Sequence, residues 1–171
     1  MTNHPFETLL LPNGAKLLFT PCPGTKSVGL EESMAQLKQA GVTMLLTLMF
    51  DAEMSANDIT TLPQLCNSMQ IAWLQLPIVD DEAPQAPFKE QWQLNKDLIL
   101  EEINNEGVVA VHCKGGTGRT GTVISLILLA LGWSAIKIQQ EVQVLKPKAL
   151  RIQKQIDYLN RQLAGSAGKF S

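Results

Sequence analysis

An apolar strand, a glycine-rich loop and a long apolar helix follow one another directly in the second half of this 171-residue chain. The strand is expected at residues 108–111, the loop at 112–121 and the helix at 120–131. A loop in this position lies at a helix N-terminus, where backbone N–H groups lack helical partners and the helix dipole adds about half a positive charge. The pattern therefore predicts an anion-binding loop, and its glycines let the backbone curl tightly.

Two residues of this loop carry reactive chemistry. Cys113 directly follows the strand, and a cysteine whose sulfur points into such a ring of N–H groups is expected to be ionised and nucleophilic at neutral pH. Arg119 lies six positions later, and its planar guanidinium matches two oxygens of a phosphate without losing its charge. We therefore expect the following residues to bind phosphate: Lys114, Gly115, Gly116, Thr117, Gly118 and Arg119.

The run from His112 to Thr120 resembles the active-site signature of the protein tyrosine and dual-specificity phosphatases, His-Cys-x5-Arg-Ser/Thr. The resemblance implies that Cys113 is a nucleophile that forms a phosphocysteine intermediate and that Arg119 holds the equatorial phosphate oxygens. Thr120 would hydrogen-bond the sulfur and ease its departure, and His112 would lie beneath the loop and keep it in shape. The family needs no metal or other cofactor, so none is expected here.

A general acid is expected on a separate loop, because the leaving oxygen of a phosphate monoester must be protonated. Residues 71–76 are predicted to form a strand, and this strand leads into a segment in which Pro77 and Pro84 enclose three carboxylates. In the dual-specificity group the acid is an aspartate on a mobile loop after this strand. The resemblance puts Asp80 in that place, with Asp81 as the alternative.

Further short segments resemble the cyclin-dependent kinase-associated phosphatases, in the order and at the spacing found there. Together they cover most of the chain from about residue 16 to residue 163: residues 37–42, 52–54, 77–80, 149–150 and 158–159. Where that group has a glutamine after an Ala-Ile pair, this chain has Arg151, with Gln155 four positions later. The sequence therefore leaves open which residue positions the attacking water.

Strands alternate with helices along the chain. This alternation predicts an α/β fold with a mostly parallel central sheet, helices on both faces and the site beyond the carboxyl ends of the strands, similar to a dual-specificity phosphatase. We expect one phosphatase domain over residues 1–171, with 165–171 as a frayed, flexible tail. Strands are expected at 15–20, 42–48, 71–76 and 108–111, helices at 31–39, 61–69, 88–105, 120–131, 134–146 and 152–163, and a loop at 50–57.

Composition narrows the class of protein. The net charge of −2 gives no sign of a nucleic-acid-binding surface. No run is long and apolar enough for a membrane span or a signal peptide, so we expect a cytoplasmic protein. Three widely spaced cysteines, Cys22, Cys66 and Cys113, and only two histidines argue against a disulfide framework and a structural zinc site. Cys22 has an alternative role, as the partner of Cys113 in a protective disulfide under oxidation.

Other interpretations of the same residues were weighed. Gly116, Gly118 and Gly121 also match a dinucleotide-binding fingerprint, but a second strand ending in an acidic residue about 20 positions on is missing. Glu53 is either a surface charge or a contact of Arg119. Lys114 follows the nucleophile, as in phosphoinositide phosphatases, or is an ordinary solvated charge.

The expected partner is a phosphorylated protein or a small phosphorylated substrate. The only tyrosine, Tyr158, lies on the last expected helix and not in an N-terminal recognition loop. By resemblance this favours a shallower site than in the tyrosine-specific enzymes, open to phosphoserine and phosphothreonine. The alternatives are a phosphoinositide or metabolite phosphatase, a phosphate-recognition module without turnover, and a rhodanese-like sulfur transferase.

Overall fold

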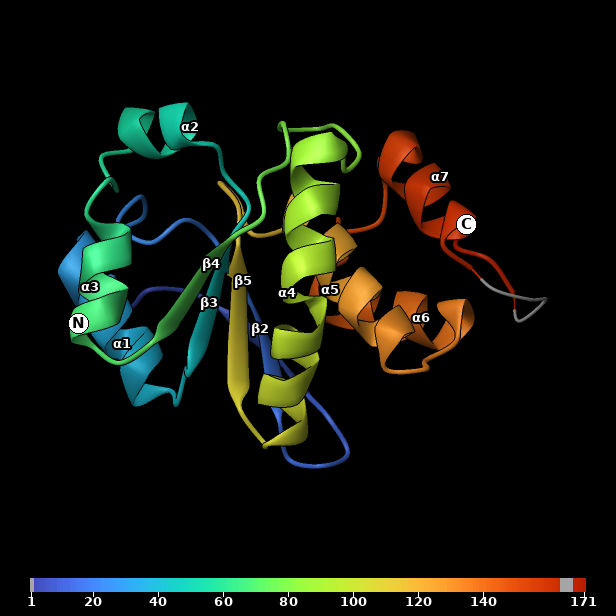
Figure 1. The fold of residues 1–171 in the computed structure, drawn as a ribbon, viewed down its shortest axis with the longest axis horizontal. Coiled ribbons are helices and arrows are strands. Elements are labelled where there is room, and N and C mark those ends of the chain that lie inside the picture. The colour runs from blue at the N-terminus through green and yellow to red at the C-terminus, as the bar shows by residue number, and fades with distance from the viewer. Residues whose placement is uncertain (1, 164–167) are drawn as a thin grey trace.

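A five-stranded sheet lies at the centre of the computed structural model, which describes residues 2–163 and 168–171. The strand order is β1-β2-β5-β3-β4 (Figure 1). Four strands run parallel, and β1 joins the edge antiparallel to β2. The strands are β1 (Glu7–Leu10), β2 (Lys16–Thr20), β3 (Met44–Thr47), β4 (Ala72–Gln75) and β5 (Val108–His112). The mostly parallel sheet is confirmed, whereas β1, which pairs with β2, was not predicted.

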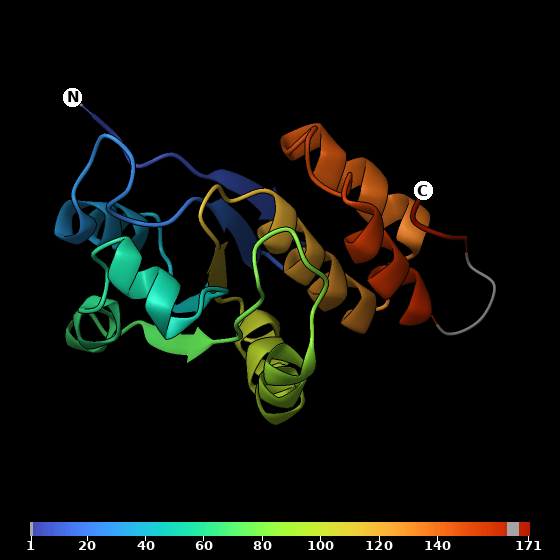
Figure 2. The same cartoon turned by 90° about the horizontal axis from the view of Figure 1, so that it is seen from above.

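Helices cover both faces of this sheet (Figures 1 and 2). One face carries α1 (Leu30–Gln39) and α3 (Leu62–Ser68). The other carries α4 (Ala86–Asn104) and α5 (Gly118–Ala130), and α5 packs in turn against α6 (Ala135–Leu145) and α7 (Gln153–Arg161). The short α2 (Asp51–Ala56) lies at the top of Figure 1, where the parallel strands end.

Two expected boundaries are wrong. The loop expected over residues 50–57 contains α2, whose first turn holds Asp51 and Glu53, acidic residues that interact favourably with the positive end of the helix dipole. Helix α5 begins at Gly118, two residues before the expected start, because Gly121 N already donates to Thr117 O at 2.8 Å. The helix N-terminus therefore lies within the cysteine loop itself.

A flexible tail was expected over residues 165–171. Residues 164–167 lie outside the described residues, so the expectation can be compared with the structure at 168–171. The last residues are docked, contrary to the expectation. Phe170 is buried, and its backbone N and O bond the side chain of Asn160 at 2.8 and 3.0 Å. Ser171 N donates to Gln139 Oε1 at 2.9 Å. The end of the chain thus contacts both α6 and α7.

The core has two halves, one on each face of the sheet. Successive strand residues point to opposite faces, so Leu45 belongs to the half under α1 and α3 and Leu46 to the half under α4 and α5. Because both faces are covered, the parallel strands are nearly continuous apolar runs. The polar residues come at the strand ends, and they form the floor of the site.

Candidate active site

A row of polar side chains lies at the carboxyl ends of three neighbouring strands. Thr20 of β2 and Thr47 of β3 are the sheet partners of His112, the last residue of β5. All three side chains are fully buried. His4, from the N-terminal segment, donates from Nε2 to Thr20 Oγ1, because the Thr20 hydroxyl itself donates to Pro21 O. The loop that carries Cys113 therefore starts from a hydrogen-bonded polar layer.

A chain of hydrogen bonds sets the tautomer of His112. Trp73 Nε1 donates to Thr47 Oγ1 at 2.8 Å, so the Thr47 hydroxyl is left to donate to His112 Nε2 at 2.7 Å. His112 Nδ1 then donates to Cys113 O at 3.2 Å. Burial lowers the pKa of His112 to about 4, so the ring is neutral at pH 7. This is the placement expected of a residue that keeps the loop in shape.

The cysteine loop curls between β5 and α5. Cys113 is 3% exposed, and its Sγ accepts a hydrogen bond from Thr120 Oγ1 at 3.1 Å. Thr117, the N-cap residue of α5, makes no side-chain cap hydrogen bond, so the first N–H groups of α5 remain available to an anion. Gly116 has φ +76°, and a Cβ there would lie 2.6 Å from Thr20 C. Only glycine fits this close approach to the strand end.

The segment after β2 is hydrogen-bonded to the cysteine loop. Cys22 N donates to Lys114 O at 3.0 Å, while the Lys114 ammonium donates to Asn57 Oδ1 at the end of α2. Cys22 is fully buried, and burial raises the pKa of its thiol to about 12. The disulfide between Cys22 and Cys113 stays a prediction.

Arg119 is anchored by the surrounding segments. Its side chain is 1% exposed, and its two Nη atoms lie 2.8 Å from the two carboxylate oxygens of Glu53. Nη1 also donates to Ile78 O at 3.0 Å. Burial alone would lower the pKa of the guanidinium, but the hydrogen bonds to Glu53 and the charges of Cys113 and Asp80 raise it above its ordinary value. Nε is buried without a partner in the described structure, so it is a donor left for a ligand.

Both acid candidates reach the site. Asp80 Oδ1 lies 3.4 Å from Arg119 Nη2, and it also accepts from Asp81 N at 3.1 Å. The Asp80 side chain is 66% exposed, so its carboxyl group can meet an incoming substrate. Both aspartates line the same cavity as Cys113, but of these two only Asp80 is paired with Arg119 in the described structure.

Gln155 is the residue that the sequence did not assign. Arg151 is exposed and donates to Pro147 O at 3.1 Å. Gln155, in contrast, is 1% exposed, and its Oε1 has no partner in the described structure, although its Nε2 donates to Glu82 O at 3.1 Å. The sequence offered Gln155 only as an alternative to Arg151, and the choice depends on which of them α7 turns toward the cavity.

These residues enclose one cavity of about 260 Å³. Its walls come from the segment after β4 that carries Asp80 and Asp81, from the cysteine loop and from α7, and these parts lie together in Figure 2. It is lined by Asp80, Asp81, Cys113, Lys114, Gly115, Thr117, Gly118, Arg119, Lys148, Ile152 and Gln155. Gly116 is not among the lining residues, and backbone atoms at the end of β2 occupy the space where a Cβ would lie.

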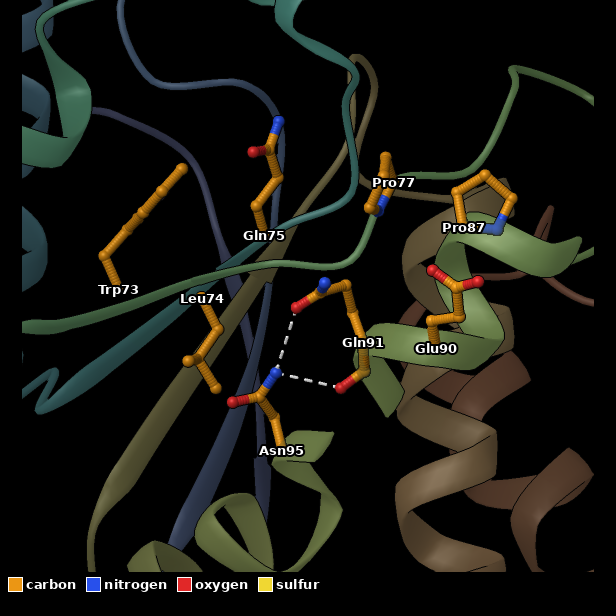
Figure 3. A pocket seen from close by; sticks show the side chains of 8 residues that line it. All are labelled: Trp73, Leu74, Gln75, Pro77, Pro87, Glu90, Gln91 and Asn95. Atoms are coloured by element: carbon orange, nitrogen blue, oxygen red, sulfur yellow. Dashed lines mark hydrogen bonds between the residues drawn. The ribbon is translucent and has the colours of Figure 1, made fainter. Parts of the chain in front are cut away.

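A second hollow, of about 410 Å³, lies between the outer edge of β4 and α4 (Figure 3). Trp73, Leu74 and Gln75 line it from the strand, and Gln91 and Asn95 face them from the helix. Its lining holds no cysteine, histidine or arginine. Trp73 connects it to the floor of the active site through the hydrogen bond to Thr47.

Two features are absent from the described part of the chain. No described helix has both the length and the apolar character needed to cross a membrane. No group of three or more histidine, cysteine, aspartate or glutamate side chains in residues 2–163 and 168–171 is arranged to hold a metal ion.

A parallel sheet with a cysteine loop between its central strand and a buried helix is the architecture of the dual-specificity phosphatases, and solved structures of that class match it. The kinase-associated phosphatase, solved with its catalytic cysteine replaced by serine, superposes with a TM-score of 0.82 at 22% identity, covering 94% of each chain. A mutant form of Tk-PTP gives 0.70 at 23% identity, over 91% of this chain and 93% of that one. PTPMT1, solved in complex with PI(5)P, gives 0.65 at 17% identity, over 85% and 88%.

The sequence comparisons define the family. The family model described as Swiss Army Knife protein, DSP-PTPase phosphatase domain (PTP-SAK), matches residues 24–168. The chain therefore belongs to this family of protein tyrosine and dual-specificity phosphatases. The tyrosine-protein phosphatase CDC14 homolog of Schizosaccharomyces pombe is 52% identical over 31 residues, which is 18% of this chain and 6% of that protein.

Proposed function

We propose that this phosphatase hydrolyses phosphomonoesters through a phosphocysteine intermediate on Cys113. The observation that carries the proposal is the convergence of Cys113, Arg119 and Asp80 on one cavity. These are a nucleophile, a phosphate clamp and an acid, the three groups that the reaction needs.

In the first step, the Cys113 sulfur attacks phosphorus and a P–S bond forms as the ester P–O bond breaks. The amide groups at the start of α5 and the buried Nε–H of Arg119 hold the equatorial oxygens. Asp80 gives its proton to the leaving oxygen. The contact of Arg119 with Asp80 at 3.4 Å supports this assignment over Asp81.

In the second step, water attacks phosphorus, Asp80 takes the proton and the P–S bond breaks. The Thr120 hydroxyl, 3.1 Å from the sulfur, donates to the departing thiolate. Gln155 accepts a hydrogen bond from the attacking water through Oε1, the buried acceptor that has no other partner in the described structure. Inorganic phosphate and free Cys113 result.

The test of the mechanism is the Cys113→Ser variant. We expect it to lose turnover of para-nitrophenyl phosphate while still binding tungstate, because the amide groups and Arg119 remain. Cys66→Ala is the matched control, since Cys66 is also a buried free cysteine but lies in α3. Full activity of Cys113→Ser would reject the mechanism.

The acid is tested separately. Asp80→Ala is expected to slow the ester with the poorest leaving group most, because that oxygen depends most on a proton. The same rates as in the wild type would move the role to Asp81.

The substrate is a phosphorylated protein side chain in this proposal. A phosphoinositide or small metabolite is the second candidate, because Lys114 and Lys148 line the cavity and would hold a second phosphate, and because PTPMT1, with the same fold, has been solved with PI(5)P bound. Phosphopeptides, phosphoinositides and sugar phosphates compared in one phosphate-release assay separate these classes. The cytoplasmic location and the single domain over residues 1–171 stay predictions.

A further inference from the structure

Glu82, in the segment that carries Asp80, makes two contacts with α7. Its carboxylate Oε1 lies 2.8 Å from Lys154 Nζ, and its backbone O accepts from Gln155 Nε2 at 3.1 Å. Lys154 and Gln155 are neighbours on α7, so one residue of this segment contacts two successive residues of the helix.

Glu82 and Asp80 belong to the same tight turn, which we name the acid turn (residues 79–82). Glu82 N donates to Val79 O at 3.0 Å and closes the turn, while Asp81 has φ +63° within it. Asp80 directly precedes Asp81, and its Oδ1 accepts a hydrogen bond from Asp81 N. Because the hydrogen bond from Glu82 N to Val79 O closes the turn over four residues, a shift of Glu82 is expected to shift Asp80 as well.

The same contact involves Gln155. Its amide has two N–H donors on Nε2 and an acceptor in Oε1, and one N–H donates to Glu82 O. Oε1 and Nε2 lie 3.7 and 3.9 Å from the position that a Cβ of Gly118 would take, at the start of α5, so the amide faces the cavity that Gln155 lines. The acceptor proposed for the attacking water thus depends on Glu82 staying in place.

We propose that Lys154 and Glu82 are positioning residues, which hold the acid turn against α7 so that Asp80 and Gln155 face the cysteine loop together. The inference rests on the proposed function, since it assigns roles to Asp80 and Gln155. Neither Lys154 nor the Glu82 side chain touches the reacting atoms. Their ion pair sets how much of the time the turn is closed.

The experiment removes the ion pair with two single variants and then restores it in a double variant in which the two charges are exchanged. Lys154→Met and Glu82→Gln each keep the length of the side chain but remove its charge. We expect each to lower kcat about two- to fivefold, the range for one exposed ion pair, with a smaller change in KM. The loss should be larger for phenyl phosphate than for para-nitrophenyl phosphate, because Asp80 is displaced. The double variant Glu82→Lys/Lys154→Glu should recover the wild-type rate.

The dependence of the wild-type rate on salt concentration distinguishes loss of the ion pair from a general loss of packing. At 1 M salt the screening length falls to about 3 Å, so the wild-type rate should approach that of the single variants. The control is Gln153→Ala, which removes a contact to Asp157 at 2.8 Å on the same helix without touching the acid turn. Its rate should equal that of the wild type.

Hydrogen exchange measures the turn without any turnover. The peptide covering residues 77–85 should exchange faster in Lys154→Met than in the wild type or in Gln153→Ala. The proposal is overturned if the single variants match the wild type in rate and in hydrogen exchange. It is also overturned if their loss of kcat does not depend on leaving group or salt and remains in the double variant with exchanged charges. Either result leaves Cys113→Ser inactive and the mechanism intact, whereas an active Cys113→Ser would reject the mechanism itself.

Discussion

Arg119 and Glu53 form a two-pronged ion pair, in which both guanidinium Nη atoms lie 2.8 Å from the two carboxylate oxygens. The carboxylate comes from α2 and the guanidinium from the first turn of α5, 66 positions apart in the chain. The pair holds the charged end of Arg119, while Ile78 O and Leu48 O accept further bonds from Nη1. The guanidinium that we propose as the phosphate clamp is therefore already oriented in this structure.

The first prediction concerns Glu53→Gln. The substitution leaves a buried guanidinium with one strong acceptor fewer, so we expect the free energy of unfolding to fall by about 2–3 kcal/mol. We also expect kcat to fall at least tenfold, because Arg119 is no longer held in one orientation. Urea denaturation and para-nitrophenyl phosphate turnover measure the two effects.

Asp51→Asn is the control for this prediction, because Asp51 lies on the same helix and accepts only from Gln75 Nε2 in an exposed contact. It should change both quantities little. If Glu53→Gln behaved as Asp51→Asn does, the ion pair would have no role in orienting Arg119.

The second prediction concerns Thr47→Val, which keeps the shape of the side chain and removes its hydroxyl. Trp73 Nε1 then loses its acceptor and His112 Nε2 loses its donor. Leaving buried polar groups unsatisfied should cost about 1–3 kcal/mol of stability for each group. Thr47→Ser keeps the hydroxyl and should remain close to the wild type in stability. A Thr47→Val protein with unchanged stability and unchanged indole fluorescence would show that the hydrogen-bond chain contributes nothing.

The third prediction compares two neighbouring glycines. Gly116 has a positive φ and a Cβ there would meet Thr20 and Pro21 backbone atoms below 3 Å, whereas a Cβ at Gly115 has nothing within 4 Å. Gly116→Ala should therefore lower the free energy of unfolding by about 2–4 kcal/mol, and Gly115→Ala by much less. Thermal unfolding of both variants checks this order. Equal melting temperatures would mean that the loop does not approach the end of β2 as closely as described.

The fourth prediction concerns the pH dependence of stability. Burial lowers the pKa of His4 and of His112 to about 4 from the ordinary 6.5. The unfolded chain therefore takes up protons between pH 6.5 and 4 that the folded chain does not. Stability is at its full value above pH 6.5 and falls as the pH drops toward 4. From pH 7 to pH 5 we expect a loss of about 1–2 kcal/mol per histidine.

The control for the pH dependence is His4→Gln, whose amide can still donate to Thr20 Oγ1. Denaturant titrations at several pH values should show about half of the wild-type slope in this variant. An unchanged slope would mean that His4 is not buried in its neutral form.

The cysteine loop could be predicted from the sequence because its geometry is local. Cys113 and Arg119 are six positions apart, and a strand, a glycine-rich turn and a helix between them leave little freedom in how they face each other. The four parallel strands were predictable for a similar reason, since each is an apolar run ended by polar or turn-forming residues. Helix α2 was missed because six residues are too few to show a helical period.

Glu53 and Gln155 could not be assigned in the same way. Each lies on a helix whose sequence is compatible with a solvent-exposed side chain, and each acts on a residue from a distant part of the chain. Glu53 meets Arg119 only because the ends of β3 and β5 are neighbours in the sheet. Gln155 reaches the cavity only because α7 packs against α5.

The amino-acid sequence alone determined the alternation of strands and helices and the glycine-rich loop that places Cys113 and Arg119 at a helix N-terminus, because hydrophobic periodicity and a glycine-rich turn act over a few residues. The packing of the chain decided the rest: the partner of Arg119, the proton position on His112, and which of Arg151 and Gln155 lines the cavity with Cys113. Those contacts join segments far apart in sequence, so they exist only once the order of strands in the sheet has brought the segments together.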